Sequence, residues 1–278
     1  MFSVILIGVG SQGLTGEQRG MLAGCRLIVG DTRHLALVQG MRAEKCPISP
    51  LASALAAIRR ALADGDVGVL ASGDPLFFGI GRRLLEEFGP EQLTVVPALS
   101  TMQEACARFK LPWDDMRMVS LHGRKTLHGP GLLLAGEKTF VFTDHHNTPA
   151  LLARQLVDYL ELIEADDLLA QCRVHVAENL GSAEERLFAG TLAEAATQDF
   201  AALNVLIVTR PRTAEENAPV FGLTEVEIAH SRGLITKDEV RAVTLHALRL
   251  PSTGVFWDLG AGSGSISVAA ARLQPGLI

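Results

Sequence analysis

Residues 67–84 read VGVLASGDPLFFGIGRRL, and this stretch decides the fold. The apolar run at 67–71 predicts a buried strand, and a helix is predicted near residues 80–88. Between them lies the loop Ser72-Gly73-Asp74-Pro75, where glycine allows close approach and proline fixes a turn. Open α/β sheets bind ligands beyond the carboxyl ends of their strands, so Asp74 is a candidate binding residue. Alternatively, residues 72–75 form a plain Asp-Pro turn with no binding role.

The alternation of strand and helix continues on both sides of this stretch, as is typical of a parallel α/β sheet. Further strands are predicted at 4–7, 26–29, 93–96 and 116–120, and helices at 15–23, 51–63 and 100–109, the last capped by Ser100. After Lys138 the pattern changes. Strands at 139–143, 173–177, 185–189 and 203–209, with a helix at 149–159, predict a second α/β subdomain with a mixed sheet.

These patterns divide the chain into a domain at 1–210, with subdomains of about 1–125 and 126–210, a polar linker at 211–232, and a partial α/β segment at 233–278. In that last segment Thr236 and Glu239 predict a capping box for a helix that ends near residue 248. A strand at 254–258 and a helix at 266–273 follow. We therefore expect two α/β subdomains followed by an incomplete third.

Composition excludes several classes of protein. The 278 residues are 48% hydrophobic and only 5% aromatic, and the net charge is −6 with no block of Lys or Arg, which argues against nucleic-acid binding. The four cysteines are scattered without a C-x-x-C pair, as in reduced cytosolic proteins. The apolar start is too short to span a membrane and leads into glycines, so it predicts a strand rather than a signal peptide. We expect a cytoplasmic protein without membrane association.

Two glycine loops suggest nucleotide chemistry. Residues 8–13 (GVGSQG) fit G-x-G-x-x-G after a strand, and Asp31 follows about 20 residues later, as in dinucleotide-binding proteins. An NAD-dependent oxidoreductase is therefore one hypothesis, and a tight turn that needs glycine only for steric reasons is the other.

Residues 258–264 (DLGAGSG) resemble motif I of Rossmann-like methyltransferases, where glycines face the amino-acid part of S-adenosylmethionine. In that family an acid on the next strand holds the ribose, and this sequence contains no such strand. We expect the segment either to be non-functional alone or to be ordered by packing on the first domain.

Residues 71–84, 95–115 (VVPALSTMQEACARFKLPWDD) and 119–124 (VSLHGR) together resemble the tetrapyrrole methylase family. The similarity is greatest to the branch that methylates C5 of precorrins. Residues 234–250 and 255–271 resemble the start of the partner domain that methylates C15 and decarboxylates. The resemblance covers nearly the whole chain, with its motifs in the right order.

The resemblance implies S-adenosylmethionine in a cleft between two subdomains, a small-molecule tetrapyrrole substrate and a homodimer. It carries cofactor binding to Gly73, Asp74, Phe77, Ser100, Thr101, Asp144, Leu180, Gly181, Asn204 and Val205. It also puts the first glycine loop, with Gly10, at the border of the active-site cleft and gives Asp31 no ribose to bind, against the NAD hypothesis.

Methyl transfer from a sulfonium is an in-line displacement that needs mainly alignment, so no metal is expected and no catalytic base is named. A tetrapyrrole carries many carboxylates, and the candidate partners near strand ends are Arg33, His34, His122 and Arg124, each equally explained as a solvated surface group. His145 and His146 are adjacent on a predicted strand and would point to opposite faces, which argues against a shared metal. Residues 113–115 (WDD) predict a turn.

The leading hypothesis is C5 methylation of a precorrin, or of its cobalt form, on the path to cobalamin. The alternatives are a methylase of the same fold with another substrate, an NAD-dependent oxidoreductase and a non-catalytic scaffold. We expect C15 methylation and decarboxylation to be absent from this chain.

Overall fold

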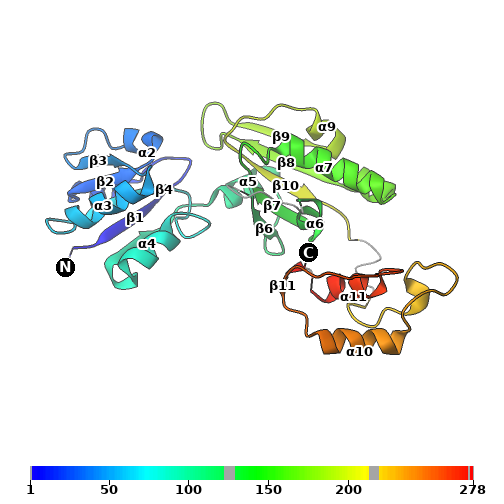
Figure 1. The fold of residues 1–278 in the computed structure, drawn as a ribbon. Coiled ribbons are helices and arrows are strands. Elements are labelled where there is room, and N and C mark those ends of the chain that lie inside the picture. Colours follow the sequence, from blue (N-terminus) through cyan, green and yellow to red (C-terminus); the bar gives the residue numbers. More distant parts are fainter. Residues whose placement is uncertain (1, 122–128, 213–218, 275, 278) are drawn as a thin grey trace. The chain divides into compact units, whose positions relative to one another are not determined.

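The computed structural model describes residues 2–121, 129–212, 219–274 and 276–277. The chain forms two compact units, Met1–Pro211 and Arg212–Ile278, and each is described by itself. The first unit contains two five-stranded sheets, one built from the blue to cyan part of the chain and the other from the green to yellow part (Figure 1).

The first sheet is entirely parallel, with strand order β3-β2-β4-β1-β5. Its strands are β1 (Val4–Val9), β2 (Leu27–Gly30), β3 (Glu44–Pro47), β4 (Val67–Ser72) and β5 (Leu93–Val96). The central strands are apolar without alternation because both faces of the sheet are covered by helices. Leu6 on β1 packs into one core and Ile7 into the other, and both are fully buried.

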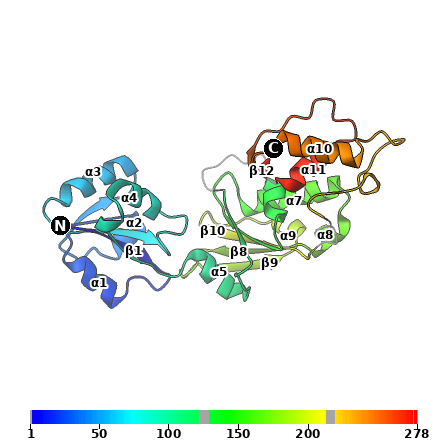
Figure 2. The same cartoon turned by 90° about the horizontal axis from the view of Figure 1, so that it is seen from below.

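Helices cover both faces of this sheet. They are α1 (Gly16–Ala23), α2 (Thr32–Ala36), α3 (Leu51–Ala61) and α4 (Gly81–Phe88), with a short 3₁₀ turn, η1 (Pro90–Gln92). Figure 2 shows α1 and α3 on opposite sides of β1. Leu22 of α1 packs with Ile7, and Ile58 of α3 packs with Leu6. The predicted parallel α/β layers are confirmed.

The second sheet is mixed, as predicted, with order β6-β7-β10-β8-β9, in which only β6 and β7 are parallel. Its strands are β6 (Arg117–Ser120), β7 (Lys138–Phe142), β8 (Arg173–Glu178), β9 (Arg186–Gly190) and β10 (Asn204–Thr209). The prediction that the first subdomain runs to about residue 125 is wrong for β6, which hydrogen-bonds to β7. The chain leaves the first sheet after Val96.

Helices also cover both faces of the second sheet. They are α5 (Thr101–Phe109), α6 (Gly129–Leu134), α7 (Pro149–Leu162), α8 (Asp166–Gln171) and α9 (Leu192–Ala196). α7 and α9 pack with Val174 and Leu206 in one core, while α5 packs with Phe140 and Ile207 in the other. Ser100 caps α5 as predicted, because its hydroxyl accepts from the Gln103 backbone N–H in a full capping box.

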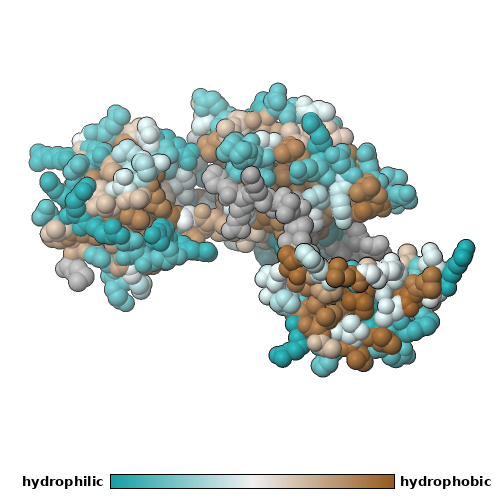
Figure 3. Space-filling model, viewed as in Figure 1, coloured by the Kyte–Doolittle hydropathy of each residue, from teal (hydrophilic) through white to brown (hydrophobic). Residues whose placement is uncertain are grey.

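The second unit contains η3 (Glu225–Glu227), α10 (Asp238–Leu248), β11 (Thr253–Gly254), α11 (Ser265–Leu273) and β12 (Gly276–Leu277). The predicted strand at 254–258 is wrong, since only Thr253 and Gly254 pair, in parallel with β12. The core of this unit is small, with Leu245, Ala269 and Ala270 buried. Apolar residues lie on its visible face (Figure 3), and Val226, Trp257 and Leu259 are among its exposed side chains.

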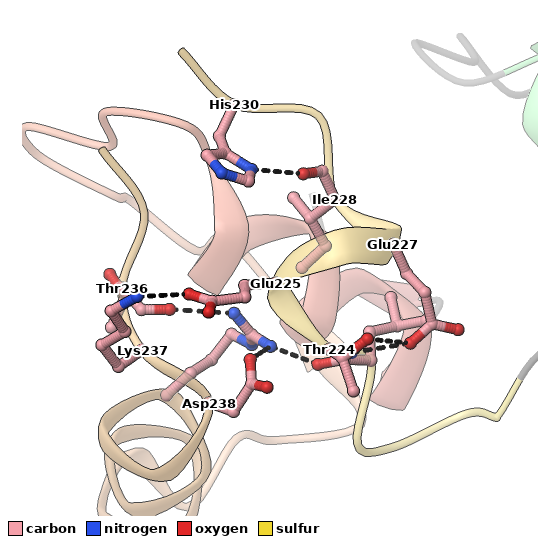
Figure 4. A network of polar contacts seen from close by, with 10 residues as sticks. Thr224, Glu225, Glu227, Ile228, His230, Thr236, Lys237 and Asp238 are labelled. Carbon is pink, nitrogen blue, oxygen red and sulfur yellow. Dashed lines mark hydrogen bonds and ion pairs between the residues drawn. The ribbon is translucent and has the colours of Figure 1, made fainter. Parts of the chain in front are cut away.

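A buried arginine joins the segment before α10 to that helix. Arg241 is 3% exposed and donates to the Thr236 and Leu223 carbonyls and to Asp238 Oδ1, the last at 2.6 Å. Figure 4 shows two of these acceptor residues, Thr236 and Asp238, within a wider network of polar contacts. Part of the predicted linker therefore belongs to the second unit. The predicted cap is also wrong: α10 begins after Lys237 without a side-chain cap, and the capping box in this region is formed by Thr224 and Glu227.

Candidate functional site

A pocket of about 300 Å³ lies in the first unit, where loops that follow β2 and β4 meet the start of α5 and the end of β7. Parallel strands end at one edge of their sheet, so residues far apart in the sequence meet there. The pocket is lined by Asp31, Arg33, His34, Ile48, Leu70, Ala71, Ser72, Asp74, Phe77, Phe78, Gly79, Ile80, Ser100, Thr101 and Phe142. Its volume lies at the lower end of the range for small-molecule sites, about 300–1,000 Å³.

Close contacts of the Gly73 backbone and one hydrogen bond of the Asp74 side chain fix the loop at residues 72–75. Gly73 has φ of +60°, and a Cβ added there would lie 3.0 Å from the Ser100 Cα and 3.1 Å from the Leu99 carbonyl oxygen. Glycine is therefore required both by conformation and by space. The Asp74 Oδ1 atom accepts from the Leu76 backbone N–H at 2.8 Å, which fixes the carboxylate on the pocket wall.

Phenylalanines form an apolar wall of the pocket. The ring of Phe142, at the end of β7, lies 5.7 Å from that of Phe77 and 5.3 Å from that of Phe78, measured between centroids. Phe78 is more than half exposed and has φ of +54°, an uncommon backbone conformation for a bulky residue. This wall joins the first sheet's loop to a strand of the second sheet, and aromatic faces of this kind suit a flat ligand ring.

Polar groups line the wall formed by α2 and the end of β4. Arg33 Nη2 donates to Ser72 Oγ at 2.6 Å, and His34 Nε2 lies 3.4 Å from the same oxygen. Burial, followed by the nearby Arg33 charge, lowers the pKa of His34 below its usual 6.5, so the imidazole is neutral at neutral pH. Asp31 Oδ1 accepts from the Arg33 backbone N–H at 3.1 Å and so caps α2.

Six of the predicted site residues line this pocket: Arg33, His34, Asp74, Phe77, Ser100 and Thr101. Gly73 lies between two of the lining residues in the chain. Ser100 is 5% exposed, and its hydroxyl both accepts from Gln103 N–H and donates to Gln103 Oε1. The hydroxyl of Ser100 therefore serves the cap of α5.

Other predicted residues lie outside the lining and have structural partners. Asp144 Oδ1 accepts from the backbone N–H groups of His146 and Asn147. The Asn204 side chain bonds to Thr143 and Ala201. Val205 is in the core with α5, and Leu180 packs against that core. A role for these residues in cofactor binding stays a prediction, and His122 and Arg124 lie outside the described residues.

In the first glycine loop, residues 8–13, and at the start of α1, backbone N–H groups that a pyrophosphate would bind already have hydrogen-bond partners within the chain. A Cβ on Gly8 would lie 2.0 Å from the Gly73 carbonyl oxygen, so this glycine permits packing between strand ends. Ser11 N–H donates to the buried carboxylate of Glu104 at 3.3 Å, and Thr15 caps α1 in a capping box with Gln18. This loop is therefore built for contact between chain segments.

Gly10 and Gly181 both lie near this contact. Gly10 pairs with Gly13 in a tight turn. Gly181 has φ of +78°, and a Cβ there would lie 2.1 Å from that of Ser11. Gly181 thus serves close packing, whereas a Cβ on Gly10 would make only an ordinary contact, 3.5 Å from the Ala98 Cβ. The predicted ligand roles of both glycines stay predictions.

The histidine pair at 145–146 does not have the strand geometry that was predicted for it. His145 and His146 lie in a bend after β7, not on a strand, and their ring centroids are 3.9 Å apart. Over the ranges that the structure describes, no cluster of three or more His, Cys, Asp or Glu is placed to hold a metal ion. Residues 113–115 form the predicted turn, with Met116 N–H bonded to the Trp113 carbonyl and Asp115 paired with Lys138 at 2.5 Å.

Sequence reasoning did not select Ser72, Phe78 and Phe142 as site residues. Ser72 begins the loop at residues 72–75, directly before Gly73, so its place at the end of a predicted strand could have indicated a site residue. Phe142 comes from the other sheet, and no local pattern connects it with residue 77. Among the described residues, no helix is long and apolar enough to cross a membrane.

Comparison with known proteins identifies similar sequences over nearly the whole chain. The family model described as tetrapyrrole (corrin/porphyrin) methylases matches residues 3–196, and that of a precorrin methyltransferase domain matches residues 210–277. A precorrin-6Y C(5,15)-methyltransferase [decarboxylating] of Mycobacterium tuberculosis is 33% identical over 286 residues, covering 98% of this chain and 67% of its own. A cobalt-precorrin-7 C(5)-methyltransferase of Salmonella typhimurium is 37% identical over 130 residues, 47% of this chain and 64% of its own. The chain thus spans about two thirds of the length of these relatives.

Solved structures share the fold. The precorrin-6Y methylase of Archaeoglobus fulgidus matches with a TM-score of 0.55 and 22% identity, over 76% of this chain and 99% of its own. The uroporphyrin-III C-methyltransferase of Thermus thermophilus, in complex with S-adenyl homocysteine, matches with a TM-score of 0.55 and 20% identity, over 74% of this chain and 92% of its own.

Proposed function

The chain belongs to the tetrapyrrole methylase family, and from that premise we propose that it transfers a methyl group from S-adenosylmethionine to C5 of a precorrin or cobalt-precorrin in cobalamin biosynthesis. The chain is therefore a methyltransferase, and the NAD-dependent oxidoreductase hypothesis is wrong. The observation that carries the proposal is the pocket at the carboxyl edge of the first sheet, to which the second sheet contributes Phe142.

The residues of this pocket fit the cofactor. S-adenosylmethionine supplies an activated methyl group on a sulfonium leaving group, together with an ammonium and a carboxylate. Asp74 presents a carboxylate of which only Oδ1 is hydrogen-bonded within the described chain, so Oδ2 can meet a cationic group. Gly73 brings backbone close to the ligand, and Phe77 and Phe78 offer apolar faces.

The protein's contribution to the reaction is alignment. Fixed loops at the strand ends hold the two reactants in one geometry, which converts a bimolecular step into an effectively unimolecular one. Aromatic side chains exclude water from the reacting atoms.

Calorimetry and turnover test the proposal. We expect the purified chain to bind S-adenosylhomocysteine and not NADH, and to add one methyl group to a precorrin in the presence of S-adenosylmethionine. Nuclear magnetic resonance of product made with a ¹³C-labelled methyl donor identifies the methylated carbon. A label at a carbon other than C5 would favour the alternative, a family member with another substrate position, and absence of cofactor binding would reject both.

The second unit is not required for C5 methylation in this proposal. Its glycine loop at 258–264 has positive-φ glycines at positions 260, 262 and 264, and Asp258 accepts from the Ser267 hydroxyl at 2.6 Å. A homodimer in the cytoplasm is also proposed, and light scattering of the purified chain tests the dimer.

A further inference from the structure

The hydroxyl of Ser72 lies between two basic side chains on the wall of the pocket. Arg33 Nη2 donates to Ser72 Oγ at 2.6 Å, and His34 Nε2 is 3.4 Å from that oxygen. All three residues line the pocket: Ser72 is the last residue of β4, and Arg33 and His34 lie on α2, the helix that follows β2. Ser72 Oγ accepts from Arg33, and its own proton is free for a ligand in the tautomer in which the neutral His34 carries its proton on Nε2 and donates to Ser72.

Arg33 is a cation without a carboxylate partner. Within the described part of the chain it forms no ion pair, although two carboxylates line the same pocket. Asp31 Oδ1 accepts from the Arg33 backbone N–H rather than from its guanidinium, and Asp74 Oδ1 accepts from Leu76 N–H. Four further N–H groups of the guanidinium therefore remain for a ligand.

His34 adds a second unsatisfied group. It is 7% exposed, and its Nδ1 atom is buried without a hydrogen-bond partner. Its lowered pKa keeps it neutral, so it contributes a hydrogen bond and no charge. A buried polar atom without a partner is uncommon in folded proteins, and a place in a functional site is one explanation for it.

We propose that Arg33, Ser72 and His34 form a subsite for one carboxylate side chain of the tetrapyrrole, and that this anchor decides which ring carbon faces the methyl donor. The inference rests on the proposed function. A guanidinium matches the two oxygens of a carboxylate with two parallel bonds, and the Ser72 proton supplies a third donor. The Asp74 carboxylate gives the cationic donor a separate partner in the same pocket.

The test compares Arg33→Met, Arg33→Lys and Ser72→Ala with the control Arg59→Met. Arg59 is also an exposed arginine, but it pairs with Glu87 outside the pocket. We expect Arg33→Met to raise KM for the precorrin about 10- to 100-fold, the loss typical of a charge-assisted hydrogen bond, and to leave the Kd for S-adenosylhomocysteine unchanged. Ser72→Ala should raise KM less, Arg33→Lys should restore part of the loss, and Arg59→Met should change neither value.

The position of the added methyl group is the second readout. With a ¹³C-labelled donor, Arg33→Met should yield product labelled at more than one ring carbon, whereas a purely structural role would keep C5 alone. A wild-type KM with label only at C5 would overturn the proposal. An equal rise in KM and in the Kd for S-adenosylhomocysteine would also overturn it, because the guanidinium would then bind the cofactor's carboxylate.

A binding probe separates this inference from the proposed reaction. Uroporphyrin carries the same kind of carboxylate side chains, and its fluorescence reports binding without turnover. Binding that weakens in Arg33→Met but not in Arg59→Met supports the subsite even where the wild-type chain methylates no precorrin. Equal uroporphyrin binding by the wild type and Arg33→Met, in a wild type that turns over precorrin, would reject the subsite and leave the reaction standing.

Discussion

Replacing Gly73 with alanine tests whether the loop at 72–75 shapes the cofactor pocket. Its φ of +60° makes alanine unfavourable by about 1–2 kcal/mol. The added Cβ would also lie 3.0 Å from the Ser100 Cα and 3.1 Å from the Leu99 carbonyl oxygen, both backbone atoms. Crowding of this kind typically costs about 1–3 kcal/mol more. Gly73→Ala should therefore lower the free energy of unfolding by about 2–5 kcal/mol in total.

Gly13 provides a matched control. It has φ of +77°, and a Cβ there would have no neighbour within 4 Å. Gly13→Ala should thus carry the conformational cost alone, about 1–2 kcal/mol. Urea denaturation measures both variants, and calorimetry with S-adenosylhomocysteine measures their affinities.

The two variants should differ most in binding. Gly73→Ala must displace the segment at 99–101, of which Ser100 and Thr101 line the pocket. Its affinity for S-adenosylhomocysteine should therefore fall at least about tenfold, or about 1.4 kcal/mol. Gly13→Ala should bind as the wild type does. If both variants lose equal stability and Gly73→Ala keeps wild-type affinity, the reasoning from the close contacts with residues 99 and 100 is refuted.

Three further predictions concern stability. Ser100→Ala and Thr191→Ala each remove a capping box, and each should lower the free energy of unfolding, measured by urea denaturation, by about 1 kcal/mol. The affinity for S-adenosylhomocysteine should stay near that of the wild type, because the Ser100 hydroxyl already bonds to Gln103. A large loss of affinity without loss of stability would contradict this. Glu104→Ala should cost about 1–3 kcal/mol by leaving the Ser11 N–H unpaired, and Glu104→Gln should cost less because it keeps an acceptor; equal losses would argue against that bond. The pKa of His34 is lowered in the folded chain, so as pH falls through 6.5 the unfolded chain gains a proton that the folded chain does not. The free energy of unfolding of the wild type, measured relative to that of His34→Gln, should therefore decrease from pH 7 to pH 5. A constant difference would show that His34 does not titrate as expected.

Features that depend on neighbouring residues were predictable. The apolar runs of β1 and β4 indicate strands buried on both faces, because a parallel sheet covered by helices has no polar side. Ser100 was predicted as a cap from its place before the helix, and the structure shows its partner, Gln103, three residues away. The same local reasoning failed at Thr236, where Arg241 binds the Thr236 carbonyl and α10 begins without a side-chain cap.

Features that depend on distant residues were not predictable. The first glycine loop fits a dinucleotide pattern, but Glu104, 93 residues away, accepts the Ser11 N–H that such a ligand would use. β6 follows α5 in the chain, yet it pairs with β7 in the second sheet.

Short-range patterns are therefore enough for most strands of the first unit, the Ser100 cap, the Gly73–Asp74 loop and the family resemblance of this chain. The tertiary structure alone brings Phe142 to Phe77 and Ser72 to Arg33. The physical reason is that strand formation and capping are decided within a few residues. A pocket wall is decided by which strand ends meet, and this depends on packing of the whole sheet.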